Sequence, residues 1–278
     1  MTIFIKKKFL CALPNNQLLN FDRVLKRVNR LPLVNNGLGQ SLTVEYKHNS
    51  QNHRLTARTS ILQLGVKGGP LVIFIPWFGG RSINLKRFLS LKRRPTWTLV
   101  GIDAFHDPKG LNQVLYLAEG SRHAYALVIS LLTRLIESAR QEGRKVGVVG
   151  LSYGANIINA YLSRGLDVPD AIVAIEGGSI IETTLHGKWK CYQYDPKVLE
   201  ALSENPALVP TQKPTEGKAA EVSLAAINKT DKVVLCQEYI WQNAKTKLYI
   251  NGPHFMAPIL NQRKIHIMAN THLGNLLS

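Results

Sequence analysis

The chain has 278 residues, of which 45% are hydrophobic and 19% are charged, and its formal net charge is +17 at pH 7. This composition excludes a disordered, collagen-like or disulfide-rich chain, and the length suffices for one large domain with a buried core. The positive charge favours contact with anionic surfaces but says little about the fold.

The cysteines and the first residues bear on the compartment. Cys11, Cys191 and Cys236 are an odd number without metal-ligand spacing, which indicates free thiols in a reducing compartment. Three lysines at 6–8 precede an apolar run, 9–13, that is too short for a secretory signal, and no run is long enough to cross a bilayer. We therefore predict a cytoplasmic protein.

Residues 1–37 are interpreted as a basic N-terminal extension, followed by one domain at 38–278. A helix at 21–31 is expected, with cations on one face and apolar residues on the other. Such a helix can bind an anionic membrane surface weakly, or its apolar face can pack on the domain; its few bulky residues favour packing. The apolar positions are Phe21, Val24, Leu25, Val28 and Leu31.

The next elements alternate between strand and helix patterns. Two antiparallel strands are expected at 41–48 and 55–64, and a strand at 70–76 is apolar on both faces, as a central parallel strand must be. A strand at 97–103 and a loop at 104–111 follow, and His106 in this loop, beside Asp103 and Asp107, is interpreted as a polar turn residue and not a metal ligand. Ser121 is expected to cap a long helix that ends near Gly143, with His123 on its surface.

The most informative stretch runs from 145 to 165. A β-branched run at 146–149 predicts a buried strand, and a helical pattern ending near Gly165 follows it. Between them, residues 150–154 read Gly-Leu-Ser-Tyr-Gly, which fits G-x-S-x-G. A serine hydroxyl becomes a good nucleophile when a base takes its proton and a tight turn presents its oxygen to substrate. Such a turn leaves no room for side chains two residues before and after the serine.

This strand, turn and helix resemble the α/β-hydrolase family over roughly residues 40–278, most clearly 70–176. The resemblance implies a mostly parallel, doubly wound sheet with helices on both faces. It also implies a lid inserted at about 179–221, where the regular pattern breaks. Ser152 would be the nucleophile, and the N–H groups of Tyr153 and Phe78 would form the oxyanion hole. The loop at 77–80 lacks the histidine that the family often carries there.

The acid and the base follow from the same resemblance. Asp231 comes after a strand at 221–228 and matches the family's acid position, with Glu176 as the second choice. His254, in a loop after a strand at 247–251, is the first choice for the base. His272 is the alternative, because residues 264–268 also resemble a strand and would place His272 in a histidine loop.

The sequence thus predicts a serine hydrolase that acts on a carboxylic ester or thioester without a metal or cofactor. The expected partner is a small-molecule acyl substrate, with aromatic side chains at 77, 78 and 153 favouring an apolar acyl group. Weak contact with a membrane surface is a secondary expectation. Nucleic acid is not expected, because the cations are spread along the chain without aromatic interleaving. The alternative function is a non-catalytic ligand-binding or membrane-surface protein on the same fold.

Overall fold

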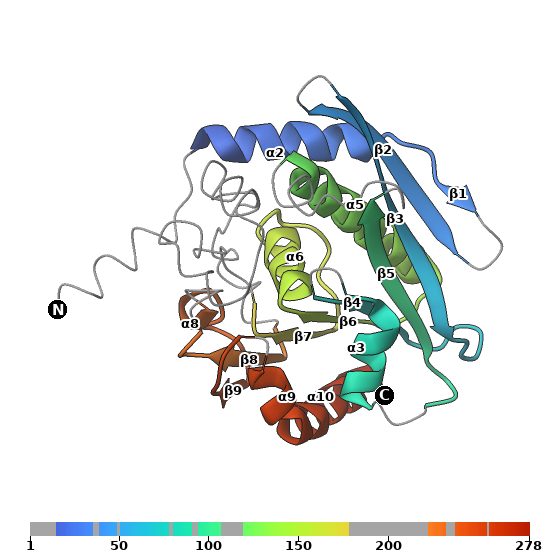
Figure 1. Ribbon diagram of the computed structural model, residues 1–278. Helices are drawn as coiled ribbons and strands as arrows, with labels where there is room; N and C mark the ends of the chain where they lie inside the picture. Colours follow the sequence, from blue (N-terminus) through green and yellow to red (C-terminus); the bar gives the residue numbers. More distant parts are fainter. Residues whose placement is uncertain are drawn as a thin grey trace.

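A nine-stranded sheet lies between two groups of helices (Figure 1). The computed structural model describes residues 15–35, 39–48, 51–77, 80–90, 94–106, 119–177, 222–231, 237–254 and 256–278. The expected lid at about 179–221 and the oxyanion-hole residue Phe78 lie outside these ranges.

The strand order in the sheet is β1-β2-β3-β5-β4-β6-β7-β8-β9. Neighbouring strands are antiparallel from β1 to β5 and parallel from β5 to β9, which confirms the predicted α/β class. The strands are β1 (Val34–Asn35), β2 (Gln40–His48), β3 (Gln51–Gln63), β4 (Leu71–Ile75), β5 (Thr98–His106), β6 (Val146–Leu151), β7 (Ala171–Ile175), β8 (Leu224–Asn228) and β9 (Lys247–Ile250).

Helices cover both faces of the sheet and create two separate cores. On one face pack α2 (Asn15–Val28), α5 (Glu119–Gln141), α6 (Tyr153–Leu162) and α8 (Gln237–Ile240), and on the other α3 (Ser82–Leu89), α9 (Ala257–Leu260) and α10 (Gln262–Leu277). Every residue of β4, β6, β7 and β8 is buried, because side chains on both faces of these strands meet a helix layer. In the described part of the chain, no helix combines the length and apolar composition needed to span a membrane.

The C-terminal region corrects one strand prediction. Residues 264–268 belong to α10 and not to a strand. Their local alternation of apolar and polar residues suggested a strand, but the buried residues of the whole segment recur every four positions, which is the spacing of a helix face. The apolar ones among them are Ile265, Ala269, Leu273 and Leu277, with the buried Asn270 and Gly274 beside them, and the helix packs on β6, β7 and β8.

Smaller corrections concern the middle of the chain. The helix α5 begins at Glu119, so Ser121 lies inside it and is not its N-cap. His123 was expected on the surface, but it is buried and its ring stacks on Tyr46 with ring centres 4.5 Å apart. The strand expected to end at residue 103 continues as β5 to His106, because β3 is long enough to pair with it up to that residue.

The N-terminal helix α2 packs on α5 through its apolar side, where Leu25 and Val28 are buried. The Arg134 guanidinium of α5 donates hydrogen bonds to the carbonyl oxygens of Asn29 and Leu31, at 2.8 and 2.9 Å. The apolar face of this helix is therefore occupied by the protein itself. Its exposed side carries the cations Arg23, Lys26 and Arg27, and Arg30 is exposed in the turn that follows the helix.

Candidate active site

The turn between β6 and α6 holds Ser152 in an unusual backbone conformation. Its φ is 53° and its ψ is −108°, a region that residues with a side chain rarely adopt. Two hydrogen bonds hold it there. The Ser152 N–H donates to the Ile175 carbonyl at 2.7 Å, and the Ser152 carbonyl accepts from the Asn156 N–H at 3.0 Å. The half-buried side chain is thus presented at the carboxyl end of the sheet.

The two glycines of the motif are required by this turn. A Cβ atom on Gly150 would lie 2.4 Å from the backbone carbon of Gly154. A Cβ atom on Gly154 would lie 2.0 Å from the carbonyl oxygen of Ile75, in the neighbouring strand β4. Both distances are far shorter than real contacts, so the steric expectation for the G-x-S-x-G motif holds at both positions.

His254 reaches Ser152 from the segment between β9 and α9. Its Nε2 atom lies 2.9 Å from the Ser152 Oγ, and the imidazole is only 3% exposed. The Pro253 carbonyl accepts hydrogen bonds from the N–H groups of Met256 and Ala257, both at 2.8 Å, which fixes the backbone on either side of the histidine. The ring is therefore held with one nitrogen directed at the serine hydroxyl.

Asp231 occupies the other ring nitrogen. It follows β8, its carboxylate is buried, and its Oδ2 lies 2.7 Å from the His254 Nδ1. An N–H on Nδ1 that donates to this carboxylate leaves the lone pair of Nε2 free to accept the Ser152 proton. The structure thus brings together Ser152, His254 and Asp231, which were singled out from the sequence.

Two amide side chains support this arrangement, and the sequence analysis missed both. The Gln237 Nε2 donates to the Asp231 Oδ2 at 2.7 Å, while the Gln237 Oε1 accepts from the Asn228 N–H at 3.0 Å. The Asn228 side chain donates to the Gly252 carbonyl at 2.9 Å and accepts from the Thr230 N–H at 3.1 Å. These bonds tie the end of β8 to the acid and to the histidine segment.

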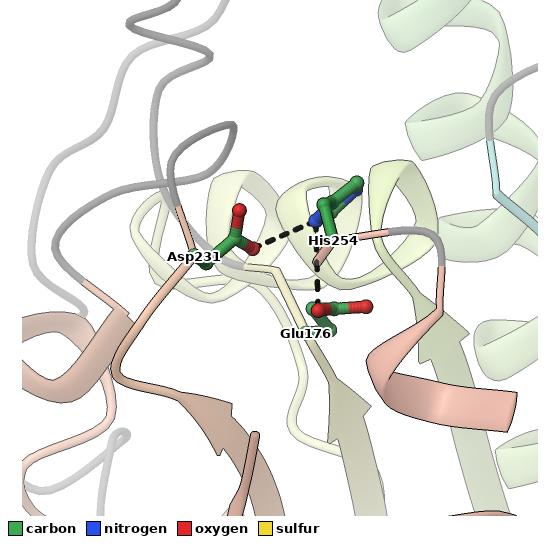
Figure 2. A group of neighbouring side chains, drawn as sticks. All are labelled: Glu176, Asp231 and His254. Carbon is green, nitrogen blue, oxygen red and sulfur yellow. Dashed lines mark hydrogen bonds and ion pairs between the residues drawn. The ribbon is translucent and has the colours of Figure 1, made fainter. Parts of the chain in front are cut away.

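Glu176 is a second carboxyl group at the same nitrogen. It directly follows β7 with φ 47°, is 1% exposed, and its Oε1 lies 3.7 Å from the His254 Nδ1 (Figure 2). Burial, with a smaller contribution from the nearby Asp231 charge, raises the pKa of Glu176 to about 9, although a 2.7 Å hydrogen bond from the Asn228 amide acts in the opposite direction. Glu176 is therefore protonated at neutral pH.

Replacing Glu176 with glutamine should stabilise the protein at neutral pH. Between pH 4.5 and about 9 the folded chain keeps a proton on Glu176 that the unfolded chain loses, so the free energy of unfolding falls as pH rises. Removing this titration should raise the free energy of unfolding by about 3 kcal/mol at pH 7 and by nothing near pH 4. Urea unfolding of wild type and Glu176→Gln at both pH values measures the difference, and a gap of equal size at the two values would contradict the assignment.

The remaining candidates have different positions. His272 lies half-buried within α10, in the helix layer on the opposite face of the sheet from α6. The Tyr153 N–H directly follows Ser152 at the start of α6, but the Tyr153 ring is buried in the core and contacts the Tyr125 ring edge-on at 4.7 Å. This ring therefore does not line an acyl-binding mouth, contrary to the expectation. Phe78 lies outside the residues described.

Glu176, Asp231 and His254 each offer an atom that could bind a metal ion, and these atoms lie within 4.8 Å of one another. The Asp231 Oδ2 and the Glu176 Oε1 each already accept an amide N–H at 2.7 Å. In the contacts that the structure shows, these groups share protons: the His254 Nδ1 bonds to the Asp231 Oδ2, and Glu176 is protonated.

Comparison with solved structures agrees with this architecture. A hyperthermophilic esterase from the archaeon Pyrobaculum calidifontis superposes with a TM-score of 0.50 at 13% identity, covering 100% of this chain and 93% of that chain. The chain has the α/β-hydrolase fold. 

Other solved structures give similar values at low identity. A thermostable esterase from Pseudomonas putida has a TM-score of 0.48 at 13% identity, covering 92% of this chain and 89% of that one. An acylaminoacyl peptidase from Pyrococcus horikoshii has a TM-score of 0.47 at 14% identity, covering 86% of this chain and 42% of that one. No protein-family model and no curated protein sequence matches the chain.

Proposed function

We propose that this α/β-hydrolase is a serine hydrolase that cleaves a carboxylic ester or thioester through an acyl-enzyme intermediate. The observation that carries the proposal is the 2.9 Å contact between the Ser152 Oγ and the His254 Nε2, with the opposite ring nitrogen 2.7 Å from the Asp231 Oδ2. A nucleophile, a base and an orienting acid in this sequence of contacts are the parts that acyl transfer requires.

In the first step the Ser152 Oγ attacks the acyl carbon of the substrate while its proton passes to the His254 Nε2. The imidazolium that forms is stabilised by the Asp231 carboxylate, which is itself held by Gln237. The Tyr153 N–H at the start of α6 donates a hydrogen bond to the carbonyl oxygen and stabilises the negative charge that develops there. The helix dipole adds to this stabilisation. Phe78 remains the proposed second donor.

In the second step His254 returns its proton to the leaving alcohol or thiol, and the acyl group stays on Ser152 as an ester. Water then attacks this ester while His254 again acts as the base, which releases the carboxylic acid and restores the serine hydroxyl. Each step uses the same two contacts of His254, so no further residue has to move between them. The esterase named among the solved structures makes oxygen esters the first substrates to test.

A fluorophosphonate probe tests the nucleophile directly, because it forms a stable bond only with an activated serine. Wild type should gain the mass of one phosphonate on the peptide that contains Ser152, and Ser152→Ala should gain none. Ser138→Ala, on the exposed end of α5, is the matched control and should label like wild type. A pre-steady-state burst of nitrophenol from a nitrophenyl ester should report the acyl-enzyme.

If wild type does not label, or if Ser152→Ala labels equally, the serine mechanism is wrong. The chain would then be better described as the non-catalytic ligand-binding protein considered from the sequence.

A further inference from the structure

Glu176 is a buried carboxyl group that the proposed reaction does not use. Together with Asp231 it faces one atom, the His254 Nδ1, at 3.7 and 2.7 Å respectively. Glu176 comes from the end of β7 and Asp231 from the segment after the adjacent strand β8, so the two carboxyls approach the ring from different sides (Figure 2).

The hydrogen-bond donors distinguish the two carboxyl groups. The Asp231 Oδ2 accepts two hydrogen bonds, from the Gln237 amide and from the histidine ring, each at 2.7 Å. The Glu176 Oε1 accepts only one hydrogen bond from the described residues, from the Asn228 amide. Two buried carboxyls this close cannot both be charged at low cost, so the proton resides on Glu176.

We propose that Glu176 is a positioning residue for His254: a reserve acceptor for the Nδ1–H that stays neutral while Asp231 is charged and replaces Asp231 when that charge is removed. This inference rests on the proposed serine mechanism. A shift of about 1 Å would bring the Glu176 oxygen to hydrogen-bond distance from Nδ1, which a small rotation about its side-chain bonds supplies.

A neutral Glu176 also has a consequence for wild type. Two charged carboxylates beside the imidazole would hold a proton on the ring, and a protonated ring cannot accept the proton of Ser152. A protonated Glu176 adds no second negative charge beside the ring. In the described part of the chain, Asp231 and His254 are the titratable groups that face Glu176; Asn228 of β8 is a neutral donor.

The isosteric variant Asp231→Asn tests the inference through a pH profile of kcat/KM on a nitrophenyl ester. At pH 7 we expect a loss of about 10⁴-fold, the size seen when such an acid is replaced by its amide. As pH rises, Glu176 should lose its proton and orient the ring. The kcat/KM of the variant should then rise about 10- to 100-fold above its value at pH 7. This recovery should occur below pH 9, because one cause of the high Glu176 pKa, the Asp231 charge, is gone.

The double variant Asp231→Asn/Glu176→Gln is the matched control, and it should lack the alkaline recovery while unfolding at a temperature no lower than that of Asp231→Asn. Identical profiles for the single Asp231 variant and the double variant would overturn the proposal. So would a loss of activity in Glu176→Gln as large as that in Asp231→Asn, because Glu176 would then be the primary acid.

Failure of the proposed function itself gives a different result, since wild type would then neither label with fluorophosphonate nor hydrolyse the ester.

Discussion

His254→Ala is expected to reduce kcat by about 10⁴- to 10⁶-fold, the loss typical of removing the base from a serine triad. Its Nε2 lies 2.9 Å from the Ser152 Oγ and is the proton acceptor of the hydroxyl. Deleting the ring leaves the hydroxyl without this acceptor. KM should change little, because the ring acts on the nucleophile more than on substrate binding. Steady-state kinetics on a nitrophenyl ester measures both constants.

His272→Ala is the matched control, since it removes the same side chain from the other candidate histidine. That residue is half-buried in α10, on the opposite face of the sheet from α6, so kcat should stay within about twofold of wild type. If His272→Ala lost activity as His254→Ala does, while both variants kept the wild-type unfolding temperature, the assignment of the base would be wrong.

Gly154→Ala is expected to destabilise the fold by about 4 kcal/mol or more, a large part of the total stability of a typical domain. The new methyl group would lie 2.0 Å from the Ile75 carbonyl oxygen, and both backbones are fixed: Gly154 in α6 and Ile75 in the buried strand β4. Urea unfolding of the purified variant measures the loss, and a lower yield of folded protein should accompany it.

Gly143→Ala provides the comparison. Gly143 has φ 69°, but an added methyl group there would meet nothing within 4 Å, so only the backbone strain of about 1 to 2 kcal/mol is expected. A Gly154→Ala loss no larger than this would show that α6 can move away from β4, and that the turn is less tightly constrained than its geometry implies.

Local patterns were sufficient to predict Ser152 and its turn. A buried strand, two glycines and a helix follow one another within twenty residues, so the whole unit is visible in a short window of sequence. The position of Asp231 after a strand was similarly local. The choice between His254 and His272 was not local, because it depends on which segment reaches the edge of the sheet beside Ser152. The short alternating run at 264–268 favoured a strand, and only the packing of the longer helix α10 excludes it.

The polar residues around the acid could not have been predicted in the same way. The Asn228 side chain contacts Glu176, and the Gln237 side chain contacts Asp231. These positions follow no recurring spacing in the sequence. Glu176 was considered as an alternative acid because it ends a strand, but its burial beside a second carboxyl depends on β7 and β8 being neighbours. Asn228, an amide residue at the carboxyl end of β8, was the one signal that could have drawn attention to this network.

The outermost strands of the sheet determine how easily two copies of the molecule can pair edge to edge. Exposed strand edges offer unpaired backbone groups to other chains, but here the border strands β1 and β9 have two and four residues. Beyond β1, the Arg27 guanidinium donates to the Glu45 carbonyl of β2, and at the other border the Lys229 ammonium lies 4.1 Å from the centre of the Tyr249 ring. One border is therefore short, at β9, and the other carries Arg27 on the part of β2 that β1 does not pair, which limits where a foreign strand could extend the sheet.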